Sequence, residues 1–234
     1  MYKKYDKAYV ICLEENSDRM SKFFKDWNNV KEFKEIHNQV ELFKAIDTRN
    51  DLWEKYIDHL SKKALKELLQ TIKTKYRKEH YCLSPGAIGC YLSHVECWKK
   101  FLNERKGNYC LIMEDDCSVP PNLMQKINKI THNMNDKWGV ILLGWKATSK
   151  YEDFNKDLYK VNTFNGTYCY LLSVFGAKKL LNEHKKIEKQ VDFFMSDNNE
   201  KAKLFGTIDD ICIQANHCNY STIQVYPVKA KEKK

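Results

Sequence analysis

The sequence predicts a single α/β domain whose sheet is mainly parallel and flanked by helices. Short apolar runs of strand length alternate along the chain with segments whose apolar residues recur at helical spacing. The chain has 234 residues, which is long for one ordinary domain and short for two. With only 8 Gly and 4 Pro and no internal repeat, it shows no sign of a linker or low-complexity tract that would divide it.

The first 46 residues predict a β-α-β beginning. Residues 9–13 form an apolar run with β-branched residues, which indicates a buried strand. The run Asn16-Ser17-Asp18 supplies residue types that cap helices, and residues 40–46 are expected to form the second strand. Between them, apolar residues at i, i+3, i+4 and i+7 mark one helical face: Met20, Phe23, Phe24 and Trp27.

The same alternation continues through the rest of the chain. Ser84-Pro85-Gly86 is a helix entrance, because Ser accepts hydrogen bonds from unpaired N–H groups and Pro suits the first turn. Strands are expected at 109–113, 140–143 and 168–174, with helices after Pro121 and from Gly176. The charged segment 50–80 carries a helical stripe that we interpret as a packing face: Leu60, Ala64, Leu65, Leu68, Leu69 and Ile72.

The net charge of +9 suggests an anionic partner: nucleic acid, a phospholipid surface or a phosphorylated small molecule. No nucleic-acid motif occurs, and basic residues do not alternate with aromatics in a stacking pattern, so no specific nucleic-acid partner is predicted. Peripheral membrane contact stays open. A cytoplasmic location is expected, because the chain shows neither a signal peptide nor an apolar run of about 18 residues. The nine cysteines lack zinc-site spacing and are interpreted as reduced, mostly buried thiols.

Three consecutive acids, Glu114, Asp115 and Asp116, directly follow the predicted strand 109–113. In open α/β sheets ligands bind at the carboxyl ends of strands, and clustered carboxylates repel one another unless a cation lies between them. On extended backbone Glu114 and Asp116 share a side, so these two are the candidate ligands for Mg²⁺ or Mn²⁺. The alternative is that the two aspartates only complement the dipole of the following helix.

The stretch Leu83-Ser-Pro-Gly-Ala-Ile-Gly-Cys-Tyr-Leu-Ser-His94, followed by Trp98, resembles the signature of glycosyltransferase family 25. This family includes bacterial lipooligosaccharide galactosyltransferases and collagen hydroxylysine galactosyltransferases. The matching blocks span roughly residues 8–195. Further blocks match in the same order: 9–13 with Asp18-Arg19, 43–47, 109–116, 138–144, 166–181 and Val191-Asp192.

This resemblance implies a GT-A-type, Rossmann-like fold and an inverting transfer from a UDP-sugar, assisted by Mn²⁺ or Mg²⁺ held at Glu114 and Asp116. The hexose would be galactose or glucose, and the acceptor a hydroxyl group on a glycan, such as lipopolysaccharide, or on a hydroxylated or glycosylated protein. Inversion needs a base on the face opposite UDP, and Asp192 is the matching candidate. Residues 1–130 would form mainly the nucleotide-sugar half and 131–234 mainly the acceptor half.

The resemblance also implies a set of donor-binding residues: Arg19, Asp47, Gly86, Ser93, His94 and Asp115. Each has a plainer alternative, such as a core histidine at His94 or a turn former at Asp47. Tyr168 and Tyr170 are expected in the core, Trp145 is a hypothetical sugar-stacking residue, and Asp209-Asp210 is either a surface turn or a second metal site. Departures from the family pattern at Cys12 and Phe193 leave open an inactive sugar-nucleotide-binding scaffold.

Overall fold

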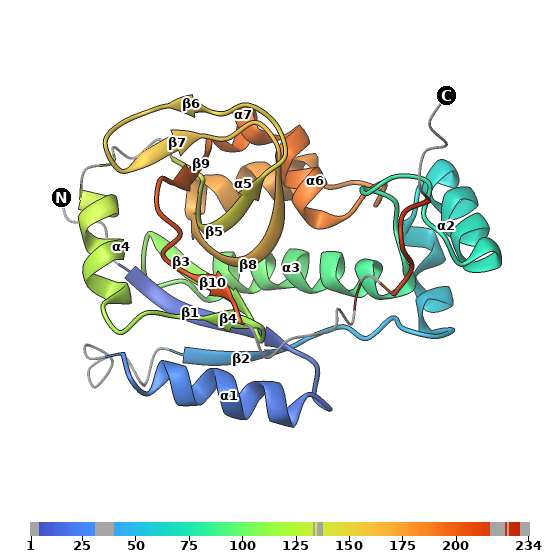
Figure 1. Ribbon diagram of the computed structural model, residues 1–234, viewed down its shortest axis with the longest axis horizontal. Coiled ribbons are helices and arrows are strands. Elements are labelled where there is room, and N and C mark those ends of the chain that lie inside the picture. Colours follow the sequence, from blue (N-terminus) through green and yellow to red (C-terminus); the bar gives the residue numbers. More distant parts are fainter. Residues whose placement is uncertain are drawn as a thin grey trace.

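The computed structural model describes residues 5–30, 40–132, 134, 138–215, 223 and 225–229. They form one eight-stranded sheet with helices packed on both faces, and a separate two-stranded ribbon of β4 (Cys117–Ser118) and β10 (Ile213–Gln214) (Figure 1). None of the helices in this part of the chain combines the length and the apolar character that a membrane span requires. The α/β fold predicted from the sequence is confirmed.

The elements alternate as the sequence predicts. The helices are α1 (Ser17–Trp27), η3 (Leu52–His59), α2 (Lys62–Thr74), α3 (Pro85–Glu104), α4 (Leu123–His132), α5 (Val174–Glu183), α6 (Val191–Asp197) and α7 (Asn199–Ala202). The strands are β1 (Tyr5–Cys12), β2 (Val40–Lys44), β3 (Tyr109–Glu114), β4 (Cys117–Ser118), β5 (Val140–Ala147), β6 (Glu152–Asp153), β7 (Leu158–Lys160), β8 (Phe164–Ser173), β9 (Leu204–Thr207) and β10 (Ile213–Gln214).

The strand order in the main sheet is β2-β1-β3-β8-β5-β9-β7-β6. Strand β1 is parallel to β2 and β3, and β5 is parallel to β9. Strand β8 is antiparallel to both β3 and β5, and β7 is antiparallel to both β9 and β6. Six strands therefore share one direction, and β8 and β7 run against them, so that the start of β8 lies at the edge where β3 and β5 end. The sequence did not predict this reversal of β8.

The strands are apolar without alternation because both faces of the sheet are buried. Along β1, Tyr9 and Ile11 belong to one core cluster, whereas Ala8 and Val10 belong to the other. Helices α2, α3, α5 and α6 contribute to the first cluster, and α1 and α4 to the second. The predicted stripe on α2 is only partly correct, because Leu69 is 51% exposed while Leu68 is buried.

The helix entrance at Ser84 is confirmed, since its hydroxyl accepts a hydrogen bond from the N–H of Ala87 at 3.3 Å. The cap of α1 differs from the expectation. Asn16 is the residue before the helix, but its side chain makes no capping hydrogen bond and donates instead to Asp115 at 3.2 Å. The beginning of α1 is thereby tied to the acidic segment that follows β3.

Helix α3 packs unusually close to the segment that follows β2. A Cβ atom at Gly89 would lie 2.2 Å from the carbonyl oxygen of Ile46 and 2.6 Å from Oγ1 of Thr48. The Gly89 N–H donates to that hydroxyl at 2.7 Å, and the hydroxyl in turn donates to the carbonyl of Pro85 at 2.6 Å. Any side chain at position 89 would push this segment away from the helix.

We therefore expect Gly89→Ala to destabilise the protein by about 1–3 kcal/mol, even though Ala is the better helix former. Thermal unfolding would show the melting temperature falling by roughly 2–4 °C per kcal/mol. Lys99→Ala, at an exposed position of the same helix, is the control and should leave the melting temperature nearly unchanged. An unchanged melting temperature for Gly89→Ala would contradict the close approach.

Candidate active site

Glu114 ends β3, and its carboxylate lies between α3 and β8. Its Oε1 accepts a hydrogen bond from the Thr167 hydroxyl at 2.7 Å and lies 3.3 Å from Nε2 of His94. Burial alone would raise the pKa of Glu114, but the interactions with His94, Thr167 and Arg19 hold it below its usual value. The carboxylate is therefore ionised at neutral pH and fixed in position from two sides.

Asp115 turns toward α1. Its Oδ1 lies 3.2 Å from Nη2 of Arg19, and its Oδ2 accepts a hydrogen bond from Asn16 at 3.2 Å. Burial raises the pKa of this carboxyl group, although Arg19 and Asn16 act in the opposite direction. Asp115 is thus a largely satisfied acid that connects the end of β3 to the first helix.

Asp116 is the least satisfied of the three acids. Its Oδ2 pairs with Nη2 of Arg19 at 3.2 Å and accepts a hydrogen bond from Gln214 at 3.0 Å. Its Oδ1 is buried and has no hydrogen-bond partner among the described residues. Burial, followed by the charge of Glu114, raises the pKa of Asp116 to about 6. A divalent cation with hard oxygen ligands fits this arrangement, because it would satisfy Oδ1 and neutralise both carboxylates.

Two cavities meet at these acids. The first is lined by the carboxyl ends of β1 and β3, by the first half of α3 and by the segment after β2. The second is lined by the end of β5, the start of β8, the start of α6 and the β10 region. Both share the side chains of Cys90, Glu114, Asp116 and Ile223. The acids therefore stand at the junction of one continuous cleft.

The structure places all six predicted donor-binding residues in the lining of the first cavity: Arg19, Asp47, Gly86, Ser93, His94 and Asp115. Several of their polar groups are already engaged within the protein. The buried Ser93 hydroxyl accepts from the Ile46 N–H at 2.8 Å and donates to the Gly89 carbonyl at 2.7 Å. Ser93 thus holds the wall of the cavity in place, and donor binding by these residues stays a prediction.

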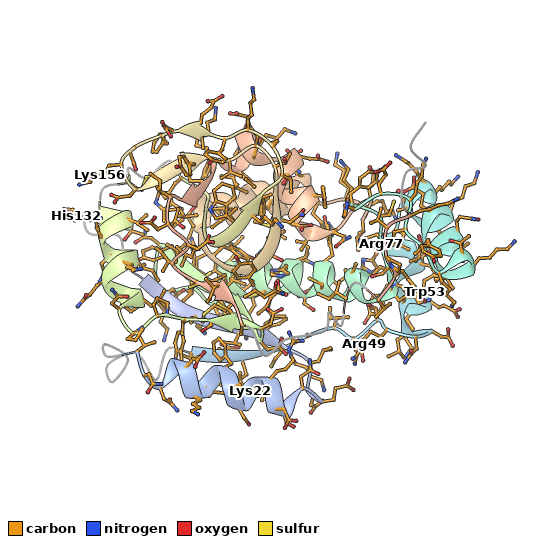
Figure 2. All side chains as sticks on the ribbon, viewed as in Figure 1. Lys22, Arg49, Trp53, Arg77, His132 and Lys156 are labelled. Carbon is orange, nitrogen blue, oxygen red and sulfur yellow. The ribbon has the colours of Figure 1, made fainter. Side chains whose placement is uncertain are left out.

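Arg49 also lines the first cavity and was not singled out from the sequence. It follows β2 in the segment leading to η3 (Figure 2). Its guanidinium pairs with Asp47, the closest contact being 2.7 Å, and with Glu15. The hydrogen bond from Arg49 lowers the pKa of Asp47 below its usual value. In the sequence, the only sign of this role is that Arg49 comes two residues after Asp47, the acid that ends a predicted strand. That pattern is too common to identify a site by itself.

A buried hydrogen-bond chain supports Glu114 from behind. The indole N–H of Trp98 donates to the hydroxyl of Tyr170 at 2.8 Å, and that hydroxyl lies 2.8 Å from Nδ1 of His94. Since the indole only donates, the Tyr170 proton is available for Nδ1, and the Nε2–H of His94 then faces Glu114. Tyr170 is in the core, as predicted, but its hydroxyl also orients His94, which the sequence did not predict.

Asp192 lies near the start of α6 and lines the second cavity. Its Oδ2 accepts a hydrogen bond from the N–H of Gly166 at 3.2 Å, and its Oδ1 accepts from the N–H of Phe193 at 2.8 Å. Gly166 has a φ of +93°, a conformation that L side chains rarely adopt, which presents its N–H to the carboxylate. Burial raises the pKa of Asp192. A positioned carboxylate with a raised pKa suits a general base.

Other predicted residues also fall on the second cavity. Trp145 lines it, although the side chain is only 9% exposed and its indole donates to the carbonyl of Thr207 at 3.1 Å. Tyr168 and Asp210 line it as well, and Asp210 accepts from the Trp145 N–H at 3.4 Å. Asp210 is thus at an exposed position that also lines the second cavity.

Comparison with known proteins places these features in context. Residues 5–165 match the family model described as "Glycosyltransferase family 25 (LPS biosynthesis protein)". A "Glycosyltransferase 25 family member" of Aedes aegypti is 29% identical over 191 residues, which cover 78% of this chain and 29% of that protein. "Procollagen galactosyltransferase 2" of Homo sapiens is 25% identical over 186 residues, with 76% of this chain and 27% of that protein covered.

One further relative is named as inactive. "Inactive glycosyltransferase 25 family member 3" of Mus musculus is 23% identical over 187 residues, which cover 76% of this chain and 29% of that protein. The chain spans less than a third of the length of each of these three relatives.

Proposed function

This chain belongs to glycosyltransferase family 25, and we propose that it transfers a hexose, galactose or glucose, from a UDP-sugar to a hydroxyl group of a glycan or a hydroxylated or glycosylated protein. The observation that carries the proposal is the junction of two cavities at Glu114 and Asp116. A glycosyl transfer needs two substrates that meet at one reacting carbon, and a cleft in two parts with acids between them meets that need.

The first cavity is the donor side in this proposal. All of its lining residues except Ile223 come from positions 11–116, and the lining includes Gly86 in the first turn of α3. The start of a 20-residue helix favours anionic groups such as a diphosphate. Arg19 and Arg49 add two guanidinium groups to the same cavity. This supports residues 1–130 as the nucleotide-sugar half, and the second cavity, lined mostly from 145–214, supports 131–234 as the acceptor half.

Glu114 and Asp116 would hold the divalent ion, Mn²⁺ or Mg²⁺. Asp116 Oδ1, which has no hydrogen-bond partner in the described part of the chain, and the mutual repulsion of the two carboxylates support this assignment. When bound, the ion supplies Lewis-acid stabilisation of the charge that develops on the leaving diphosphate. Glu114 is kept in its orientation by the Thr167 hydroxyl and by the hydrogen-bond series from Trp98 through Tyr170 to His94. This reduces the reorganisation needed when substrate binds.

Asp192 is the proposed general base. Inversion requires the acceptor hydroxyl to attack from the side opposite UDP, and Asp192 belongs to the second cavity, away from the donor lining. Its carboxylate would take the hydroxyl proton as the bond to the sugar forms. Hydrogen bonds from the N–H groups of Gly166 and Phe193 hold it in place and leave further lone pairs for that proton.

The second candidate function is an inactive sugar-nucleotide-binding scaffold. Arg19 pairs with Asp115 and Asp116, so its guanidinium can neutralise part of the charge that a divalent ion would neutralise in a transferase. Relatives of similar identity include proteins named as inactive. Slow hydrolysis of the donor separates the two functions, because a transferase passes sugar to water and a scaffold does not.

Thermal unfolding with UDP, in the presence and absence of Mn²⁺, is the first test. At 100 times its dissociation constant a ligand stabilises the folded state by about 2.7 kcal/mol, which corresponds to roughly 5–10 °C for a chain of this size. We expect this shift with UDP plus Mn²⁺, and much smaller shifts with ADP or GDP as controls. The absence of a shift with every nucleotide would contradict the donor site, and a shift without donor hydrolysis would favour the scaffold.

A further inference from the structure

Three buried cysteines converge on the face of the sheet opposite His94. Cys117 lies on β4, Cys169 on β8, and Cys212 just before β10. Each is at most 1% exposed, and their sulfur atoms all lie within 4.8 Å of one another. They belong to the core cluster that α1 and α4 cover. His94 is part of α3, on the other face of the sheet, and Glu114 contacts it there. This site is therefore separate from the carboxylates of the cleft.

The spacing of these sulfurs fits a metal–thiolate site. With a metal–sulfur bond of about 2.3 Å, three sulfurs around one ion lie about 4 Å apart, which is within the observed limit. Thiolate sulfur selects soft ions such as Zn²⁺ and Cu⁺ over the hard ions that carboxylates prefer. We propose that Cys117, Cys169 and Cys212 bind one thiophilic metal ion in a structural site. Binding releases the proton of each thiol that becomes a ligand.

The position of the three cysteines indicates what the ion would stabilise. Cys169 lies on β8, in the middle of the main sheet, whereas Cys117 and Cys212 lie in and next to the β4–β10 ribbon. An ion bound by all three would connect the ribbon to the sheet. The segment before β10 has little regular structure, and the N–H groups of Ile211 and Cys212 both donate to the Leu143 carbonyl, at 2.7 and 2.9 Å. That ribbon carries Gln214, which donates to Asp116. The ion would therefore fasten a wall of the cleft to the sheet.

The test is metal content together with metal titration. The reduced protein, unfolded and refolded with Cd²⁺ so that the buried site is accessible, should bind one equivalent and show a thiolate-to-metal charge-transfer band in the ultraviolet. Native mass spectrometry of protein expressed with added zinc or copper should show one retained ion. Loss of that ion should lower the melting temperature, without requiring any nucleotide.

Cys212→Ala and Cys169→Ala should each weaken Cd²⁺ binding at least tenfold and reduce the charge-transfer band. Cys110→Ala is the matched control, because Cys110 is also fully buried but does not belong to this group, and it should retain the full band. Because two of the metal-ligating cysteines are replaced separately, the test still gives an answer if one of these variants fails to fold.

Three results would overturn the proposal. One is the absence of any band with refolded wild-type protein, and another is an equal band in the ligand variants. The third is a disulfide between two of the three cysteines. It would appear in unreduced, metal-free protein as a mass lower by two hydrogens, and peptide mapping would assign the loss to two of these residues. Each result is independent of UDP binding, so failure here leaves the proposed transferase function intact.

Discussion

Replacing Asp116 with Asn is expected to abolish Mn²⁺-dependent UDP binding while leaving the ligand-free protein at least as stable as the wild type. The pKa of Asp116 is raised from 3.8 to about 6, because burial and the charge of Glu114 disfavour its ionised form. A carboxyl group whose pKa is higher in the folded state contributes stability at low pH that is lost as the pH rises toward 6. At neutral pH the ionised carboxylate therefore destabilises the fold, by at most about 2–3 kcal/mol at 1.36 kcal/mol per unit.

Asparagine removes that charge and keeps the shape. In thermal unfolding without ligand, the melting temperature of Asp116→Asn should stay level or rise by several degrees. The additional shift produced by UDP with Mn²⁺ should disappear, which at 100 times the wild-type dissociation constant requires a loss of affinity of more than about 100-fold, or about 2.7 kcal/mol. Such opposite effects on stability and binding are typical of a functional acid, whereas a structural acid would lose stability on substitution.

Asp210→Asn is the matched control, because Asp210 also lines the second cavity and was the alternative metal ligand. It should bind UDP with Mn²⁺ nearly as the wild type does. If Asp210→Asn loses the shift and Asp116→Asn keeps it, the metal site lies at Asp210 and the assignment to Glu114 and Asp116 is wrong.

The sequence predicted those parts of the fold and site that depend on local patterns. Apolar runs located the central strands because both faces of the sheet are buried, so each run lacks charged residues. The acids at 114–116 and the donor-side residues were predicted from continuous stretches of sequence that resemble the family. The structure brings the donor-side residues together around one cavity. The reversed direction of β8 was not predicted, because an apolar run carries no information about which way it enters the sheet.

The contacts that were missed are the ones that depend on that reversal. Because β8 is antiparallel to β3, its first residues lie beside the end of β3, which brings Thr167 to Glu114 and Gly166 to the helix that carries Asp192. Asn16 belongs to a residue type that caps helices, yet its side chain contacts Asp115, which is 99 residues away. Long-range pairings of this kind have no signature within a short window of sequence.

Asp192→Asn is expected to lower the rate of sugar transfer by about 10²–10⁴-fold, the range typical of a lost general base, while UDP affinity stays nearly unchanged. Asp192 lines only the second of the two cavities, so its charge is not required to hold the donor. The amide is close to the carboxylate in shape, and its oxygen can still accept the Gly166 or the Phe193 N–H, but it cannot take the acceptor proton. Transfer and donor hydrolysis are measured together with the UDP-induced thermal shift.

The pH profile of the wild type gives a second check on the same residue. A base must be ionised to act, so transfer should decline on the acid side at a pH above the usual range for an aspartate, because burial raises the pKa of Asp192. Asp197→Asn, at an exposed position on the same helix, should leave both rate and profile unchanged. If Asp192→Asn instead loses the UDP-induced shift along with transfer, Asp192 binds the donor, and the base must be sought among the other acids of the second cavity.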